Sequence, residues 1–258
     1  MNKSALITGS TSGIGKAFAD KLAFEKYDLI LVSRDAEKLR EQSEALSRKH
    51  GINVSFIPLD LAQPGAAGKV FDTVQKMGLP VQLLINNAGF NEAGRFLKTN
   101  MQKEREMANL HMTFTTEMMK LFIPNMVSGK FGRVLNLGST GSFIPCPNDA
   151  VYAATKAYIL SVSKAVNAEL KGTGVSITTL CPGSTKTEFA QKAGIENTPL
   201  FQKYVMEPSV VADIGYRALM KGKAVEIAGT YNKMQVLFSK ILPSSIVNNI
   251  TKKMLAPA

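Results

Sequence analysis

Residues 9–15 read Gly9-Ser10-Thr11-Ser12-Gly13-Ile14-Gly15, and they join an apolar run, Ser4–Thr8, to a stretch with helical periodicity. Glycine at 9 allows a tight turn, Gly13 lets the backbone approach a pyrophosphate, and Gly15 permits close packing of helix on strand. The helix that begins here directs its N-terminal N–H groups and positive dipole end toward phosphates. A plain Gly/Ser loop is the alternative. Because the glycines lie between a strand pattern and a helix pattern, nucleotide binding is favoured.

Outward from this loop, short β-branched runs alternate with longer amphipathic stretches, which is typical of a parallel sheet. Right-handed crossovers then predict a doubly wound α/β fold of the Rossmann type, with about seven strands, helices on both faces and ligands at the carboxyl ends of the strands. The expected strands are Ser4–Thr8, Leu29–Ser33, Val54–Pro58, Val81–Asn86, Arg133–Leu137, Val175–Leu180 and Ala224–Ala228. The expected helices lie near 13–26, 35–49, 64–77, 100–128, 150–171 and 208–221.

The chain is predicted to be a single domain, because it contains no interior linker, low-complexity tract or repeat. Residues 1–230 form its main part, and 231–258 form a helical extension of the same domain. Residues of about 184–207 show little strand pattern and fit a mobile lid, with a static surface loop as the alternative. The extension predicts two basic amphipathic helices, Tyr231–Leu242 and Ser244–Leu255. Packing against the core or a partner subunit is favoured over peripheral membrane attachment.

The composition is ordinary for a globular protein, because 45% of the 258 residues are hydrophobic and 20% are charged. The net charge of +11 is spread along the chain, Trp is absent and no nucleic-acid-binding module is visible, so no nucleic-acid partner is expected. The charge favours phosphate-bearing ligands or anionic membrane instead. Two distant cysteines, Cys146 and Cys181, predict a reducing, cytoplasmic location and no structural metal. The sequence begins without a signal-peptide pattern, and no apolar run is long enough to span a membrane.

Tyr152 and Lys156 form the most informative pair of polar residues, because their spacing places them on one face of a helix. A phenol with a pKa near ~10 holds its proton tightly at neutral pH. A nearby ammonium favours the phenolate and lowers that pKa. Such a pair can protonate a carbonyl oxygen as hydride arrives, or take the proton back in the oxidative direction. An exposed helix face is the alternative for the pair taken alone.

The motifs together resemble those of the short-chain dehydrogenase/reductase family over about residues 3–190. The resemblance is carried by the Gly-x-x-x-Gly-x-Gly loop, Asn86-Asn87-Ala88-Gly89, Ser139 thirteen residues before Tyr152, Lys156, and Pro182-Gly183. It implies catalysis by Ser139, Tyr152 and Lys156 together with an asparagine, a position that Asn109 matches. It also implies a homo-oligomer, either a dimer or a tetramer. Within the family the chain is most similar to 3-oxoacyl and hydroxysteroid reductases.

The expected activity is hydride transfer between NADP(H) and a ketone or secondary alcohol. Ser139 can donate a hydrogen bond to the carbonyl and stabilise the developing alkoxide. The resemblance implies that Lys156 also holds the nicotinamide ribose, and Asn109 is expected to position a water that joins Lys156 to solvent. A non-catalytic NADP(H)-binding regulatory protein is the alternative, although mere binding needs no proton donor.

NADP(H) is expected because Ser33 and Arg34 follow the second strand, where an NAD-selective enzyme has a carboxylate. A guanidinium binds a 2′-phosphate bidentately, and Asp35 is expected to lie one residue too far along, in the next helix. By resemblance, Asp60 contacts the adenine. The residues expected to bind the cofactor are Gly9, Ser10, Ser12, Gly13, Ile14, Gly15, Ser33, Arg34, Asp60, Leu61, Asn87, Ala88, Gly89, Tyr152, Lys156, Pro182, Gly183, Thr185 and Thr187.

The substrate is expected above Tyr152, between a loop at 141–148 and the segment 184–206. Apolar residues around this place predict a lipophilic carbonyl or alcohol, such as a steroid or a long acyl chain, although many of them can equally belong to the core. The expected substrate-contacting residues are Phe90, Ser139, Phe143, Cys146, Tyr152 and Phe189.

Overall fold

The computed structural model describes residues 3–202 and 204–255. It contains one seven-stranded parallel sheet in the order β3-β2-β1-β4-β5-β6-β7. Strand β1 pairs with β2 on one side and with β4 on the other, so the strand order reverses next to β1. The strands are β1 (Ser4–Thr8), β2 (Asp28–Ser33), β3 (Val54–Pro58), β4 (Leu83–Asn86), β5 (Gly132–Leu137), β6 (Val175–Cys181) and β7 (Val225–Ile227). The predicted doubly wound topology is confirmed, and a ligand is expected at this reversal.

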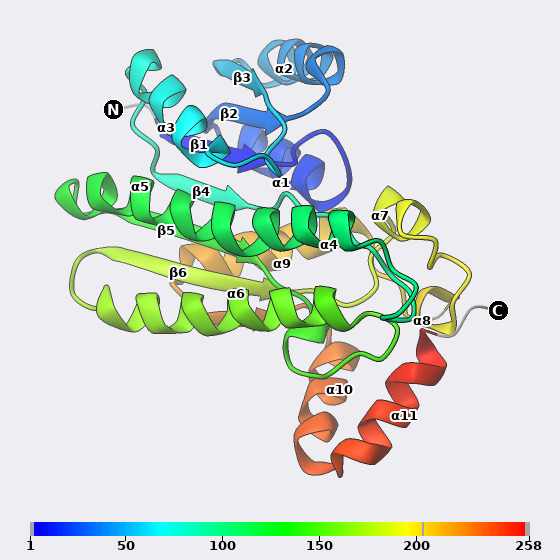
Figure 1. Ribbon diagram of the computed structural model, residues 1–258. Coiled ribbons are helices and arrows are strands. Elements are labelled where there is room, and N and C mark those ends of the chain that lie inside the picture. The colour runs from blue at the N-terminus through cyan, green and yellow to red at the C-terminus, as the bar shows by residue number, and fades with distance from the viewer. Residues whose placement is uncertain (1–2, 203, 256–258) are drawn as a thin grey trace.

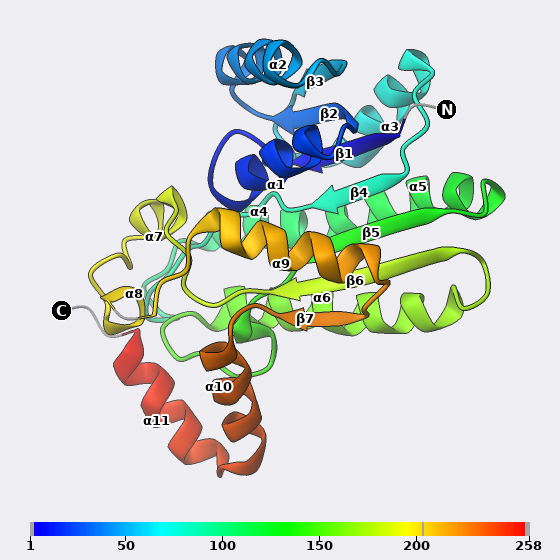
Figure 2. The same ribbon diagram turned by 180° about the vertical axis from the view of Figure 1, so that it is seen from behind.

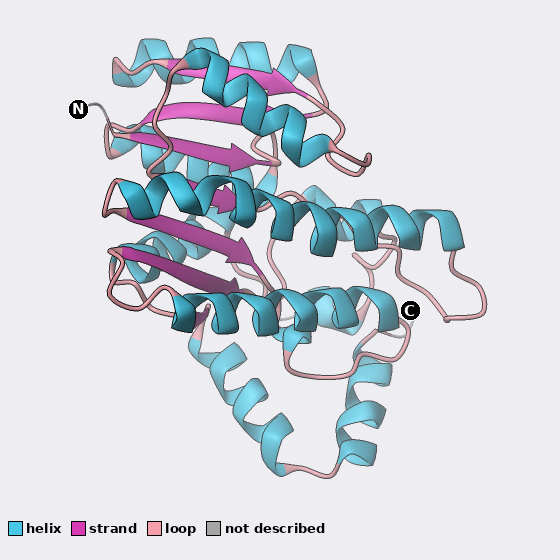
Figure 3. Ribbon diagram, turned by 60° about the vertical axis from the view of Figure 1, so that its left-hand side comes forward, coloured by secondary structure: helices cyan, strands magenta, loops and turns pink. Residues whose placement is uncertain are grey.

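Helices cover both faces of the sheet (Figure 3). On one face α1 (Gly13–Phe24) packs against α9 (Pro208–Met220), with α2 (Ala36–His50) beside α1 (Figure 2). The other face carries α3 (Ala66–Met77), α4 (Met101–Ala108) with α5 (Thr115–Ser128), and α6 (Ala150–Glu169) (Figure 1). Because helices cover both faces, the central strands are apolar on both sides, and every residue of β1 is buried.

The single helix expected near 100–128 is divided by a π-helical turn, η1 (Asn109–Phe114), between α4 and α5. A π-helical turn accommodates one extra residue and rotates the side chains that follow it. The apolar period of the sequence gives no sign of this turn.

The expected lid contains two short helices, α7 (Glu188–Lys192) and α8 (Pro199–Gln202), and a bridge between Thr185 and Met206 closes its base. A 3₁₀ turn, η2 (Thr140–Ser142), follows β5. The C-terminal extension forms a helical hairpin, α10 (Thr230–Ile241) and α11 (Ser244–Met254), which projects from the sheet (Figure 1). No helix in the described part of the chain is long and apolar enough to cross a membrane.

Candidate active site

A large cavity opens at the carboxyl ends of the strands, with a volume of about 810 Å³. Its walls come from the glycine loop after β1, the ends of β2, β4, β5 and β6, the first turns of α6, the lid, and the C-terminal hairpin. Segments far apart in the sequence therefore meet at the edge of the sheet where the topology predicts a ligand.

The glycine loop is held in a conformation that depends on its glycines. Gly9 and Gly13 have φ values of +67° and +54°, which side-chain-bearing residues rarely adopt. A Cβ on Gly15 would lie 2.1 Å from the carbonyl oxygen of Gly9 and 2.4 Å from Nδ2 of Asn87. That amide donates to the carbonyl oxygens of Thr8 and Gly9 at 2.9 and 3.1 Å. The result is an open backbone cradle at the start of a helix, which fits a dinucleotide pyrophosphate.

Most residues expected to bind the cofactor line this cavity, and two do not. Gly15 lies beneath the loop, where it allows the close approach just described. Ser10 is buried outside the cavity, and its carbonyl oxygen accepts a hydrogen bond from Gln42. The residues that line the cavity are Gly9, Ser12, Gly13, Ile14, Ser33, Arg34, Asp60, Leu61, Asn87, Ala88, Gly89, Tyr152, Lys156, Pro182, Gly183, Thr185 and Thr187.

The end of β2 presents Ser33 and the exposed Arg34 to the cavity, and Asp35 is absent from its lining. Asp35 is the N-cap of α2, where its side chain accepts a hydrogen bond from the backbone N–H of Lys38 at 3.1 Å. Thr11 also lines the cavity, and its hydroxyl lies 2.9 Å from that of Ser33. Thr11 was not among the residues predicted to bind the cofactor, although it lies inside the glycine loop.

Tyr152 and Lys156 face the same cavity from the first turns of α6, as their spacing predicts, and Ser139 faces it from the end of β5. The ammonium of Lys156 donates to the carbonyl oxygen of Leu137 at 2.9 Å and lies 5.5 Å from the centroid of the Tyr152 ring. The hydroxyl of Ser139 accepts a hydrogen bond from the N–H of Gly141 at 3.1 Å. The structure therefore brings together three of the four residues expected to carry catalysis.

Burial controls the protonation of this group. It raises the pKa of Tyr152 well above its ordinary value, the negative charge of Asp149 raises it further, and a hydrogen bond with Ser139 acts in the opposite direction. Burial also lowers the pKa of Lys156 to about 8. The pKa of Tyr152 is therefore raised, and not lowered as the spacing to Lys156 predicts, with desolvation as the main cause. Tyr152 is held in the protonated form that a proton donor needs.

The fourth expected residue, Asn109, lies elsewhere. Its Nδ2 donates to the carbonyl oxygen of Ala62 at 2.7 Å, and it does not line the cavity. The π-helical turn brings His111 toward Tyr152 instead, with 5.8 Å between the two ring centroids. His111 is buried, and burial together with the charge of Lys156 lowers its pKa well below the ordinary value, so the imidazole is neutral. The sequence contains only two histidines, so one within two residues of Asn109 was a signal that could have been followed.

The substrate side of the cavity is largely apolar. Phe90, Cys146 and Phe189 line it as expected, and the ring centroid of Phe189 lies 5.7 Å from that of Tyr152. The expectation for Phe143 is wrong, because its ring lies outside the lining under the ammonium of Lys240. The C-terminal hairpin supplies wall residues that the sequence did not assign to the site, namely Tyr231, Met234, Phe238, Leu242, Val247, Ile250, Met254 and Leu255.

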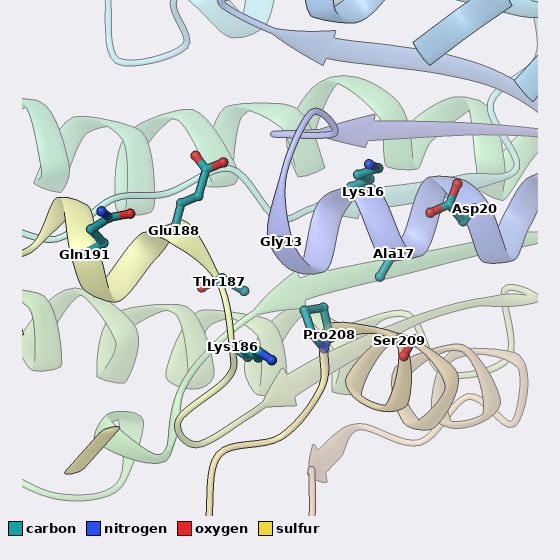
Figure 4. Close-up of a pocket in the computed structure, with 10 residues that line it drawn as sticks. All are labelled: Gly13, Lys16, Ala17, Asp20, Lys186, Thr187, Glu188, Gln191, Pro208 and Ser209. Carbon is teal, nitrogen blue, oxygen red and sulfur yellow. The ribbon is translucent and has the colours of Figure 1, made fainter. Parts of the chain in front are cut away.

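A second, shallower hollow of about 540 Å³ lies outside the glycine loop, between α1, the base of the lid and the start of α9 (Figure 4). Gly13 and Thr187 belong to both hollows. A Cβ on Gly13 would lie 2.9 Å from Cγ2 of Thr187, so the missing side chain lets the lid approach the glycine loop. The main cavity, which contains Tyr152, is the one with the reactive groups.

Known proteins are similar to this chain in sequence and in fold. The family described as short chain dehydrogenase matches residues 3–197. A very-long-chain 3-oxoacyl-CoA reductase from Phaeosphaeria nodorum is 36% identical over 179 residues, which are 67% of this chain and 52% of that protein. A 7beta-hydroxysteroid dehydrogenase from Collinsella aerofaciens is 29% identical over 233 residues, 90% of this chain and 88% of that protein. A short-chain dehydrogenase from Sphingobium yanoikuyae, solved in complex with NADPH, superposes with a TM-score of 0.83 at 28% identity and covers 93% of both chains.

The chain belongs to the short-chain dehydrogenase family, whose match covers strands β1 to β6, the glycine loop and the Tyr152 helix. It spans about half the length of the Phaeosphaeria reductase.

Proposed function

We propose that this protein is an NADP(H)-dependent oxidoreductase that interconverts a lipophilic ketone and the corresponding secondary alcohol. The observation that carries the proposal is the convergence of Tyr152, Lys156 and Ser139 on one cavity that also contains the glycine cradle. A regulatory protein that only binds the dinucleotide would not need a protonated phenol buried beside a lysine.

The residues of this chain then have separate roles. A bound nicotinamide supplies the hydride for reduction of the carbonyl carbon. Tyr152 gives its phenolic proton to the carbonyl oxygen, while Ser139 donates a hydrogen bond that stabilises negative charge there. Lys156 replaces the proton on Tyr152 or holds the ribose hydroxyls, and its pKa of about 8 lets it exchange a proton near neutral pH. The apolar walls exclude water from the reacting atoms.

Arg34 supports the choice of NADP(H) over NAD(H). It is an exposed cation at the rim of the cavity, and Ser33 beside it offers a hydroxyl instead of a carboxylate. Asp35, the acid that could favour NAD, is engaged in capping α2. The Sphingobium relative was solved with NADPH, which is consistent with this preference.

The substrate class follows from the cavity and from the relatives. Aromatic and aliphatic side chains of the lid and the hairpin form most of the wall around Tyr152. The names of the Phaeosphaeria and Collinsella relatives refer to long acyl and steroid substrates. We therefore propose a bulky lipophilic ketone of the hydroxysteroid or 3-oxoacyl type.

The test is NADPH oxidation with a panel of steroid ketones, 3-oxoacyl thioesters, sugars and small ketones, with NADH as the cofactor control. Tyr152→Phe removes only the phenolic hydroxyl group and should abolish turnover while NADPH still binds. Tyr158→Phe is the matched control, because Tyr158 lies on the same helix but is partly exposed and pairs with Thr116. Tight NADPH binding without turnover of any substrate would favour the regulatory alternative, and failure to bind a dinucleotide would contradict both.

We also propose a homo-oligomer, a dimer or tetramer, in the cytoplasm, with peripheral membrane contact through α10 and α11 as a further proposal. The support for a reducing location is that Cys146 and Cys181 are both unpaired. Light scattering of the purified protein tests the oligomer, and fractionation of cells tests the location.

A further inference from the structure

Asp149 occupies the N-cap position of α6, but its side chain does not cap the helix. The residue is only 7% exposed and lines the main cavity. Its Oδ1 is sealed from solvent and has no partner within ordinary hydrogen-bond geometry in residues 3–202 and 204–255. The side chain of an N-cap aspartate normally accepts a hydrogen bond from a backbone N–H in the first turn of the helix. Asp149 lacks this stabilising hydrogen bond and lies in the cavity wall.

Asn91 is a second buried polar residue in the cavity wall, and it lies against Asp149. It is also 7% exposed and lines the cavity, and neither Oδ1 nor Nδ2 has a partner of ordinary geometry among the described residues. A hydrogen bond from Asn91 lowers the pKa of Asp149, whereas burial raises it, to about 7 overall. Buried polar atoms without full hydrogen bonding are rare, so the two together need an explanation.

The backbone holds this pair in place. Asn148 has a φ of +67°, and the N–H of Asp149 donates to the carbonyl oxygen of Cys146 at 3.0 Å. The N–H of Gly94 donates to the carbonyl oxygen of Asn148 at 2.8 Å, which ties the loop after β4 to the loop before α6. The two polar side chains thus meet because two separate loops are fastened together at the wall of the cavity.

Their position relative to Tyr152 limits what they can contact. Asp149 is the N-cap of α6 and precedes Tyr152, in the first turn, by three residues. The charge of Asp149 is close enough to affect the pKa of the phenol. Phe90, Cys146 and Phe189 form apolar parts of the same lining. A group on the substrate that reaches Asp149 must therefore be only a few bonds from the carbonyl that Tyr152 protonates.

We propose that the Asp149 carboxyl, oriented by the buried amide of Asn91, forms a polar subsite that accepts a hydrogen bond from a hydroxyl or ammonium group two to four bonds from the reacting carbonyl. The substrate is then a lipophilic hydroxy ketone or amino ketone, or the corresponding alcohol. This inference rests on the proposed ketone reduction and narrows its substrate class. A site with buried polar groups discriminates strongly against an analogue that leaves them unpaired.

Benzoin and deoxybenzoin test this subsite, because they differ only in the hydroxyl next to the ketone. The wild-type protein should show kcat/KM for benzoin at least about tenfold higher than for deoxybenzoin. In Asp149→Leu the ratio should fall to near one, and in Asp149→Asn it should fall partly, because the amide oxygen still accepts. Since any effect of Asp149 on Tyr152 alters both substrates, the ratio reports the subsite alone. Asp72→Asn, on the exposed surface of α3, makes the same change of charge and should leave the ratio unchanged.

Calorimetric binding of the same two ketones to the protein loaded with NADP⁺ separates this inference from the proposed activity. Tighter binding of benzoin that is lost in Asp149→Leu and reduced in Asp149→Asn would support the subsite even if neither ketone is reduced, in which case only the reductase proposal fails. The amino analogue of benzoin shows whether an ammonium is preferred to a hydroxyl. Equal binding of benzoin and deoxybenzoin to the wild-type protein, or a preference that Asp149→Leu and Asp149→Asn both retain, would overturn the subsite.

Discussion

Nδ1 of His111 lies 2.9 Å from the hydroxyl oxygen of Thr155, the residue directly before Lys156. That hydroxyl donates its only proton to the carbonyl oxygen of Tyr152 at 2.7 Å, so it must accept from His111. The tautomer of the neutral imidazole is thereby assigned, with the proton on Nδ1 and a lone pair on Nε2. The imidazole links the π-helical turn to the first turns of α6, which carry the proton donor and its lysine.

His111→Ala should lower kcat by about tenfold to a hundredfold, because it removes the ring that packs edge-on against Tyr152 and orients Thr155. The KM for NADPH should change little, since His111 does not line the cavity. Thr155→Val should lower kcat by a similar factor. The double variant should lower kcat by less than the product of the two single factors, because both substitutions remove the same interaction. His111→Gln retains an N–H donor and should recover part of the activity. A variant that unfolds more readily but turns over normally would reduce His111 to a packing role.

Gly15 and Gly68 offer a matched pair for the glycine cradle. Gly15→Ala places a methyl group 2.1 Å from a backbone oxygen that cannot move freely, so it should destabilise the fold by about 1–3 kcal/mol and abolish NADPH binding. Gly68 lies inside α3 with nothing within 4 Å of its Cβ position, and Gly68→Ala should stabilise by about 0.5–1 kcal/mol. Urea unfolding and NADPH titration of both variants check this. Normal binding in Gly15→Ala would show that the cradle is not the phosphate site.

The fold could be predicted because alternating apolar runs and helical stretches leave few topologies, and Tyr152 and Lys156 could be found because a four-residue spacing survives in any regular helix. The place of His111 beside Tyr152 could not be predicted from sequence, because the π-helical turn leaves no trace in the apolar period. The water-positioning role of Asn109 stays a prediction. Asp149 was missed for a related reason. An aspartate directly before a helix predicts an N-cap. The side chain lies at the cavity instead, because the loop after β4 is hydrogen-bonded to the loop before α6.

Arg34→Ala should weaken NADPH binding by about tenfold or more and leave NADH almost unaffected, because only NADPH carries the 2′-phosphate that a guanidinium can bind. Arg40→Ala is the matched control, since Arg40 lies on α2, pairs with Glu37 and does not line the cavity. Fluorescence titration with NADPH and with NADH gives the two affinities of each protein, for the wild type and for both variants. Equal losses for NADPH and NADH would refute the assignment of Arg34.

Asp149 should make stability depend on pH in a specific direction. Its pKa is raised from 3.8 to about 7 by burial, so the folded protein binds an extra proton between these values. The stabilisation from the neutral carboxyl is therefore complete below about pH 4 and is lost as the pH rises through 7. Asp149→Asn cannot ionise, so relative to it the wild-type urea midpoint should fall between pH 5 and pH 8, by the equivalent of a few kcal/mol. Parallel midpoints across this range would mean that Asp149 titrates normally.

The outer surface of the C-terminal hairpin provides the test of membrane contact. Leu237 and Ile241 lie one turn apart on α10 and are 58% and 71% exposed, while Lys233 and Lys240 lie on the same helix. If this surface binds anionic lipid, the protein should sediment with vesicles that contain phosphatidylserine, less so at high salt, and not with neutral vesicles. Ile241→Glu should remove the retention because it places a carboxylate in the apolar surface, whereas Leu97→Glu, at a residue that is 90% exposed but distant in the sequence, should not. If retention is absent for the wild-type protein but Ile241→Glu converts an oligomer to a monomer, the hairpin covers this surface with a second copy of the chain instead of lipid.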